Sequence, residues 1–327
     1  RDLRMSRGLG DVYKRQALQY QAYYNSMILD RKDYNNIICN KYIPLVVRHP
    51  LSSHVDFAYE GILETYPDGL DKRRFTGVSE DIVKYIREAV NDGWYVVTSA
   101  NEYYLEGKMM SGIRYFRHDI MISDYDDAAR TFKTIGYDAT GHYRESEVSY
   151  NSMNKAYYSL QNEWEFETSL FKINDRTYDI DIDRIRYDLS QYLDAVNPVT
   201  GYLDEFIAGK ADGKWLNNGI EPYSGIRCLD YLEKVLSGTS GINEERSITV
   251  VKEHIDVIEC ALNKLKQHGV SDYDAGLMSE IKQLIRMLKM QHIKYIEFEE
   301  DGLTDRMADS VRRLKDKEYT LLKGVCG

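Results

Sequence analysis

The C-terminal third of the chain carries an apolar repeat that strongly restricts its structure. Apolar residues recur at steps of three and four in two successive stretches, and the repeat comprises Ile248, Val251, Ile255, Ile258, Leu262 and Leu265, then Met278, Ile281, Ile285 and Leu288, with His292 and Tyr295 continuing it. Such spacing places the side chains on one face of a helix. The sequence therefore predicts helices over residues 243–268 and 272–299, with others over 180–193, 223–236 and 304–323.

The same repeat allows two arrangements of the C-terminal helices. Two helices of one chain can pack their apolar faces against each other as an antiparallel hairpin, and this is the arrangement we favour. The faces can also pair between two chains, so a homodimer through the C-terminal helices is the alternative.

The preceding part of the chain alternates between helical and strand patterns. Ser79, followed by acidic residues, predicts the start of a helix that ends at Asp92-Gly93. Strands are predicted over 94–99, 115–123, 130–137, 142–148 and 165–173, and helices over 17–29 and 149–161. The turn at Tyr125-Asp126-Asp127 makes a hairpin of the second and third strands. We expect an α+β fold, with an antiparallel sheet followed by a mainly α-helical region.

Composition excludes several classes of protein. The chain has 43 Lys+Arg against 53 Asp+Glu, a net charge of −10, which argues against a nucleic-acid or membrane partner. No apolar run approaches the roughly 18–20 residues that cross a bilayer. The four cysteines are dispersed and no HExxH or glycine-rich phosphate-binding motif is present. We therefore expect no metal, no cofactor and a cytoplasmic location.

The predicted organisation has four parts. Residues 1–16 have no apolar period and resemble a translated sequencing adapter, so we interpret them as a non-native tail; the alternative is a basic, flexible arm. If the tail is non-native, the authentic start of the protein has been lost. An α+β domain is expected over 17–175, an extension with a long loop at 197–223 over 176–240, and a helical bundle over 241–327.

The best candidate for chemistry is His118, which opens a predicted buried strand. Because a sheet fixes the backbone, the imidazole can be aimed with little loss of entropy. If the hairpin turns near Asp126, Asp138 lies at the same end of the sheet and its carboxylate can orient the ring. A structural histidine beside a surface aspartate fits the spacing equally well.

Residues around His118 resemble a known family. The resembling stretches are Gly93-Trp94-Tyr95-Val96-Val97 with the helix before it, Asn101-Glu102-Tyr103-Tyr104, Arg117-His118-Asp119-Ile120, Ser123-Asp124-Tyr125-Asp126-Asp127, Glu147-Val148-Ser149-Tyr150 and Tyr223-Ser224-Gly225-Ile226-Arg227. Together they resemble the butirosin-biosynthesis protein H-like family over residues 17–240. That family has a papain-like cysteine-protease fold related to the double-glycine leader peptidases.

The resemblance implies acyl transfer through a Cys-His-Asp triad. His118 corresponds to the general base and Asp138 to its orienting carboxylate. The family's cysteine lies at the start of the first helix, where this chain has none. Cys39 is the remaining candidate nucleophile, although its apolar surroundings favour a buried packing role. We expect the other cysteines, Cys228, Cys260 and Cys326, to be inert.

The resemblance also implies the substrate and partner. An aminoacyl group moves from a carrier-protein thioester to an amine during peptide or polyketide-type natural-product biosynthesis, so a carrier protein or synthetase is the expected partner. Glu102, Tyr103 and Tyr104 are the expected substrate-binding residues. Loss of the nucleophile, by truncation or by degeneration, leaves a non-catalytic pseudoenzyme or an interaction protein as the alternative function.

Overall fold

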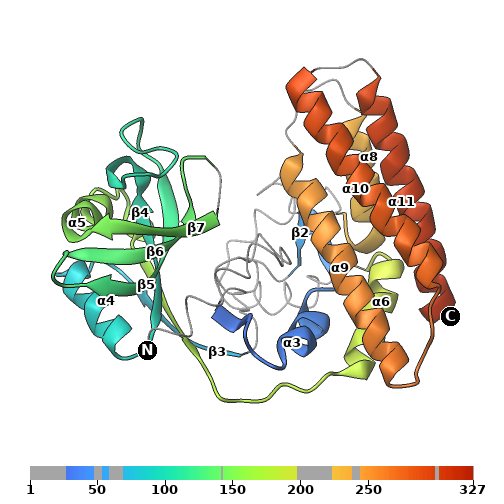
Figure 1. The fold of residues 1–327 in the computed structure, drawn as a ribbon, viewed down its shortest axis with the longest axis horizontal. Helices are drawn as coiled ribbons and strands as arrows, with labels where there is room; N and C mark the ends of the chain where they lie inside the picture. Colours follow the sequence, from blue (N-terminus) through green and yellow to red (C-terminus); the bar gives the residue numbers. More distant parts are fainter. Residues whose placement is uncertain are drawn as a thin grey trace. The chain divides into compact units, whose positions relative to one another are not determined.

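The computed structural model describes residues 27–47, 54–58, 69–140, 143–196, 223–237, 244–298 and 302–326. These residues form two compact units (Figure 1). Unit 1 contains the described residues in 27–30 and 69–177, and unit 2 contains those in 31–58 and 178–326. The predictions for residues 1–16, for most of the helix at 17–29 and for the loop at 197–222 lie outside the described residues.

Unit 1 is built on an antiparallel sheet of six strands in the order β3-β8-β4-β5-β6-β7. The strands are β3 (Leu70–Thr76), β4 (Tyr95–Asn101), β5 (Arg117–Asp126), β6 (Thr131–Tyr137), β7 (Tyr143–Ser149) and β8 (Glu167–Ile173). All five predicted strands are confirmed. The edge strand β3 was not predicted because its sequence, LDKRRFT, is mostly charged and shows no apolar alternation.

The β5–β6 hairpin turns where the sequence predicts it. Asp126 pairs with Thr131, and the turn between them is closed by Asp126, whose Oδ1 accepts the N–H groups of Ala128 (2.8 Å) and Ala129 (3.0 Å). Arg130 completes the turn in a left-handed conformation, with φ of 56°. The hairpin therefore fixes which residues stand at each end of the sheet.

Two helices cover one face of the sheet, α4 (Ile82–Asn91) and α5 (Tyr150–Tyr158). Their buried side chains form one core with those of the strands, including Ile82, Ile86, Met153, Tyr157, Val96, Ala100, Ile120, Ile122 and Phe132. Asp81 rather than the predicted Ser79 caps α4, since its Oδ1 accepts the Lys84 N–H at 2.9 Å. Ser79 instead forms hydrogen bonds with two tyrosines of α5. Its backbone carbonyl accepts a hydrogen bond from the Tyr158 hydroxyl, and its backbone N–H donates to the Tyr157 hydroxyl.

Unit 2 is mainly helical. It contains α3 (Tyr34–Lys41), α6 (Ile182–Leu193), α8 (Cys228–Leu236), α9 (Glu245–Gln267), α10 (Ala275–Phe298) and α11 (Leu303–Cys326), with a two-stranded sheet of β1 (Leu45–Val47) and β2 (Val55–Phe57). The helices predicted over 180–193, 223–236, 243–268, 272–299 and 304–323 correspond to α6, α8, α9, α10 and α11. The fold class of the described residues is thus α+β with a helical C-terminal region.

The apolar repeat is buried inside unit 2. Its residues on α9 and α10, from Ile248 to His292, are each at most 2% exposed, while Tyr295 is half-buried. The chain reverses between α9 and α10, and α10 packs in turn on α11 (Figure 1). The repeat therefore drives packing within one chain.

The division into units places the segment before β3 with the C-terminal helices. The boundary follows Thr177, and the described residues from 31 to 58 belong to unit 2. Their backbone groups bond there: Val55 donates to Ser247 Oγ (3.1 Å) and the Ile43 carbonyl accepts from His254 Nε2 (2.8 Å). The described residues in 178–237 belong to the same unit as the described residues after 243.

A buried acid lies at the centre of unit 2. Glu318 on α11 is 1% exposed, and its Oε1 lies 3.7 Å from Nδ1 of His254 on α9. Burial raises the pKa of Glu318 to about 7, although Tyr192 opposes this. Burial also lowers the pKa of His254 to about 4. Near pH 7 His254 is therefore mostly uncharged, whereas Glu318 is divided between its protonated and ionised forms.

We predict that Glu318→Gln stabilises unit 2 above pH 7. Because the folded-state pKa of Glu318 exceeds the ordinary value of 4.5, its ionisation lowers stability between about pH 4.5 and 7, and the full loss is reached above pH 7. The full effect is on the order of 3 kcal/mol. His254, whose folded-state pKa is below 6.5, acts oppositely between about pH 4 and 6.5. Urea unfolding followed by helical circular dichroism should show stability of the variant rising to pH 6.5 and then remaining level. The stability difference between the variant and the wild type should grow from about pH 4.5 to 7, and a difference that stays constant over this range contradicts the assignment.

Candidate functional site

His118 stands at the end of the sheet opposite the β5–β6 turn. It pairs with Ala100 of β4 and shares a face with Ile120 and Ile122, the face that α4 and α5 cover. Although α4 and α5 cover this face, 43% of the His118 side chain is exposed to solvent. The ring of Phe116 lies 5.5 Å from that of His118, centroid to centroid. The imidazole is therefore positioned by the sheet and open to solvent.

Glu102 holds the imidazole. Its Oε1 lies 2.6 Å from Nδ1 of His118, and its side chain is only 7% exposed. Glu102 begins a 3-10 turn, η2 (Glu102–Tyr104), directly after β4. Asn101 fixes this turn, because its Oδ1 accepts the N–H groups of Tyr103 (3.2 Å) and Phe116 (3.1 Å). The dyad is thus built by the β4–β5 pair and the turn that follows β4.

The hydrogen bond determines which form of His118 is present. An ionised carboxylate can only accept, so Nδ1 must carry the proton that it donates to Glu102. In the neutral ring Nε2 is then unprotonated and can take a proton from a reacting group. This arrangement is that of a general base with an orienting carboxylate.

Asp138 does not orient His118. It lies at the predicted end of the sheet, but its Oδ1 accepts the N–H (2.7 Å) and hydroxyl (2.6 Å) of Thr140, and its Oδ2 is 2.5 Å from Nε of Arg144. The reason is that β5–β6 pairing stops at Met121 and Ile135, so no ladder bonds hold Asp138 beside His118. After Tyr137 the chain turns away, and an aspartate at a turn bonds its own backbone two residues on.

Lys108 is a buried lysine whose pKa is influenced by both Glu102 and Asp138. It is 5% exposed, and burial lowers its pKa, while Glu102 and Asp138 oppose that shift. The loop that carries it is tied to the end of β6 by a hydrogen bond from Ala139 N–H to the Gly107 carbonyl (2.8 Å). Lys108 therefore links the surroundings of both acids electrostatically.

Several exposed aromatic and apolar side chains lie near Glu102 or His118 in the sequence. Tyr103 and Tyr104, predicted to bind substrate, follow Glu102 and are partly exposed, with ring centroids 4.9 Å apart in an edge-on arrangement. Further exposed side chains on neighbouring segments are Met109, Ile113, Phe116 and Trp164. Arg117 covers the Trp164 ring, 5.3 Å from its centroid. These groups make this end of unit 1 apolar at its rim.

Cys39 is poorly suited to act as a nucleophile. It lies on α3 of unit 2, is 0% exposed, and its Sγ is 2.8 Å from Sγ of Cys260. The hydrogen bond to Cys260 and burial raise its pKa, which disfavours the reactive thiolate. Cys228, Cys260 and Cys326 also belong to unit 2. The sequence of unit 1 contains no cysteine.

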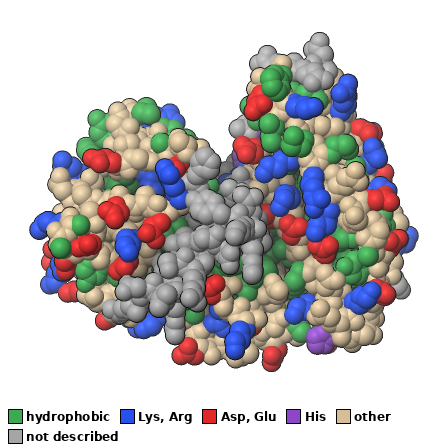
Figure 2. All heavy atoms as spheres, viewed as in Figure 1, with side chains coloured by type: hydrophobic (Ala, Val, Ile, Leu, Met, Phe, Trp, Pro, Cys, Tyr) green, Lys and Arg blue, Asp and Glu red, His purple; other side chains and the backbone are tan. Residues whose placement is uncertain are grey.

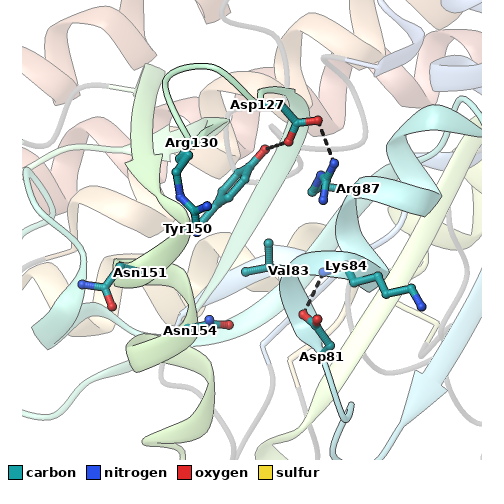
Figure 3. Close-up of a pocket in the computed structure, with 9 residues that line it drawn as sticks. All are labelled: Asp81, Val83, Lys84, Arg87, Asp127, Arg130, Tyr150, Asn151 and Asn154. Carbon is teal, nitrogen blue, oxygen red and sulfur yellow. Dashed lines mark hydrogen bonds and ion pairs between the residues drawn. The ribbon is translucent and has the colours of Figure 1, made fainter.

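A cavity of about 360 Å³ opens at the other end of the sheet, beside the β5–β6 turn (Figure 3). Its lining residues come from the first two turns of α4 and α5, from Asp81 before α4 and from the β5–β6 turn. Asp127 accepts hydrogen bonds from Arg87 (2.7 Å) and from the hydroxyl of Tyr150 (2.9 Å). The cavity lies roughly 25 Å from His118 along an extended strand, so it is separate from the dyad.

Two features are absent from the residues that the structure describes. No cluster of three or more His, Cys, Asp or Glu side chains there is arranged to hold a metal ion. No helix in the described part of the chain has an apolar stretch of the length that a bilayer requires.

No protein-family model matches the chain, and a search of the curated proteins finds no significant match. The function must therefore be argued from the site.

Sequence reasoning found His118 and Glu102 but not their pairing. The resemblance assigns Glu102 to substrate binding, whereas the pairing of Ala100 with His118 places Glu102 at the imidazole. Lys108 was not identified. The signal that could have found the pairing is Asn101-Glu102 at the end of one strand and His118 at the start of the next, which antiparallel pairing brings together.

We predict that Glu102→Gln slows carbethoxylation of His118 by diethyl pyrocarbonate several-fold. The carboxylate increases the electron density of the ring, and an amide does so less. Asp138→Asn serves as the matched control and should leave the rate at His118 unchanged. Quantitative mass spectrometry of the His118 peptide measures both rates. Slowing by Asp138→Asn and not by Glu102→Gln contradicts the pairing.

Proposed function

We propose that unit 1 is a papain-like acyl-transfer module in which His118 is the general base and Glu102 its orienting residue. The observation that carries the proposal is the 2.6 Å hydrogen bond between a partly exposed imidazole and a buried carboxylate. Such a pair keeps one ring nitrogen free to take protons from a reacting group.

The fold of unit 1 supports this proposal. An antiparallel sheet with a histidine at the start of one strand, and helices on one face, agrees with a papain-like domain. The stretches that resemble the butirosin-biosynthesis protein H-like family also coincide with structural features. Glu102 and His118 form the dyad, and Asp126 and Asp127 lie at the β5–β6 turn.

The chemistry proposed for the chain uses the acceptor as the nucleophile. In the proposed reaction of the chain as given, an acceptor amine attacks the carbonyl carbon of a thioester directly. His118 Nε2 takes the proton from the attacking nitrogen as the C–N bond forms. The tetrahedral intermediate then collapses with cleavage of the C–S bond, and His118 returns the proton to the departing thiolate.

The acyl donor and setting follow from the same proposal. A thioester on a carrier protein of peptide or polyketide-type biosynthesis in the cytoplasm is the proposed donor. The apolar rim formed by Tyr103, Tyr104 and Phe116 suits contact with an acyl group.

We predict that His118→Ala lowers the rate of acyl transfer by about 10²-fold or more, and Glu102→Gln by about tenfold or more. The assay uses an aminoacyl pantetheine thioester with an amino sugar as acceptor, and follows amide formation by mass spectrometry. His268→Ala, at an exposed position after α9, is the control and should keep the wild-type rate. Thermal unfolding checks that each variant is folded. An unchanged rate in His118→Ala, or no amide with the wild-type chain, contradicts the proposal.

A second candidate function is an interaction protein that uses the C-terminal helices. It is favoured by an apolar strip on the last part of α10, comprising Met287, Met290, Ile293 and Phe298, all at least 37% exposed. Hydrophobic side chains are visible where α10 ends (Figure 2). Such exposure on a helix otherwise packed inside one unit is typical of an association surface.

For this second function we expect a homodimer that Met290→Glu combined with Phe298→Glu converts to a monomer. Buried like charges would oppose association through the strip. Size-exclusion chromatography with light scattering measures the mass, and Tyr187→Glu on α6, an exposed aromatic of unit 2, is the control. A wild-type chain that remains monomeric at high concentration contradicts this function.

A further inference from the structure

Cys39 and Cys260 form a thiol pair that joins two helices far apart in the sequence. Cys39 lies on α3 and Cys260 on α9, 221 residues later, and their Sγ atoms are 2.8 Å apart. A disulfide bond is about 2.05 Å long, so the sulfur atoms are roughly 0.8 Å further apart than in the bonded state. A small movement of the two sulfur atoms would therefore allow a disulfide bond to form between Cys39 and Cys260.

The two thiols differ in access and in acidity. Cys39 is 0% exposed, whereas Cys260 is half-buried and can be reached from solvent. The hydrogen bond from Cys39 lowers the pKa of Cys260, and the positive charge of Lys264 adds to this, against burial. Cys260 is therefore the thiol that ionises first, and the thiolate is the form that reacts with oxidants.

Hydrogen bonds also join the α3 helix to residues 178–181, where the chain enters unit 2 for the second time. Asn36 donates to the Tyr178 carbonyl (3.0 Å), and Asn40 donates to the Asp179 carbonyl (3.0 Å) and accepts the Asp181 N–H (3.0 Å). A covalent link from α3 to α9 would therefore fix this segment to the core of unit 2 as well.

We propose that Cys39 and Cys260 form a reversible disulfide that locks α3 onto α9 when the protein meets a peroxide. This modification site is separate from the His118–Glu102 dyad. It gives a role to Cys260, which the sequence alone predicts to be inert.

The reaction has two steps. The Cys260 thiolate attacks one oxygen of hydrogen peroxide, breaking the O–O bond and giving a sulfenic acid and hydroxide, which takes up a proton to become water. The Cys39 sulfur, held 2.8 Å from the Cys260 sulfur, then attacks it in spite of its raised pKa, and the Cys39 proton passes to the departing hydroxide. This step forms the S–S bond and releases the sulfenic oxygen as a second water. Each sulfur gives up one electron, and peroxide accepts two. A dithiol reductant reverses the bond by exchange.

The test treats the full chain with hydrogen peroxide in a Cys326→Ser background, which removes the exposed thiol. After alkylation and proteolysis without reductant, mass spectrometry should find the Cys39 and Cys260 peptides linked, and Cys228 alkylated. The oxidised protein should melt higher than the reduced form by roughly 5–15 °C, because the link closes a long loop of the unfolded chain. Dithiothreitol should abolish both the link and the shift.

Two variants test whether the link and the melting shift belong to this cysteine pair. Cys260→Ser, added to the same background, should lose the link and the melting shift, whereas Cys228→Ser should keep both. If the three remaining thiols stay fully alkylatable after peroxide, or if Cys39 is linked to a cysteine other than Cys260, the proposal is wrong. Because the peptides are mapped in protein that retains both Cys39 and Cys260, this outcome is decisive even if Cys260→Ser fails to fold.

Discussion

The antiparallel pairing of β4 with β5 is the constraint on which the candidate site depends. It places Ala100 opposite His118, and because β4 ends at Asn101, the next residue, Glu102, emerges beside the imidazole. Asn101 then closes the turn by bonding the backbone of Tyr103 and Phe116. A shift of one residue in this register would turn His118 to the other face of the sheet and remove the dyad.

Hydrogen-bond donors decide the charge of buried acids in this protein. Burial raises the pKa of Glu165 in unit 1, but hydrogen bonds from Tyr115, Asn162 and the Gln161 backbone outweigh it and lower the pKa to about 2. Glu318 in unit 2 is more deeply enclosed and has too little such compensation, so its pKa rises to about 7. The two acids belong to one chain and differ through their surroundings alone.

Much of the fold was predictable because local patterns persist over many residues. The repeat of α9 and α10 and the apolar runs of β4 and β5 each predict their element within a few residues. Prediction failed where the pattern is short or charged, as in β3, or where a contact joins distant segments. Ser79 was predicted as the cap of α4, yet Tyr157 and Tyr158 of α5 engage it and Asp81 takes its place.

The sequence by itself determined which elements form, that His118 opens a strand, and that the repeat of the C-terminal helices needs an apolar partner. These features depend on residue spacing, which is local. The tertiary structure decided that Glu102 rather than Asp138 meets His118, that the segment carrying Cys39 joins unit 2, and that Cys39 meets Cys260. Each of these is a contact between segments distant in the chain, and its partner is selected by strand register and helix packing, which no local spacing encodes.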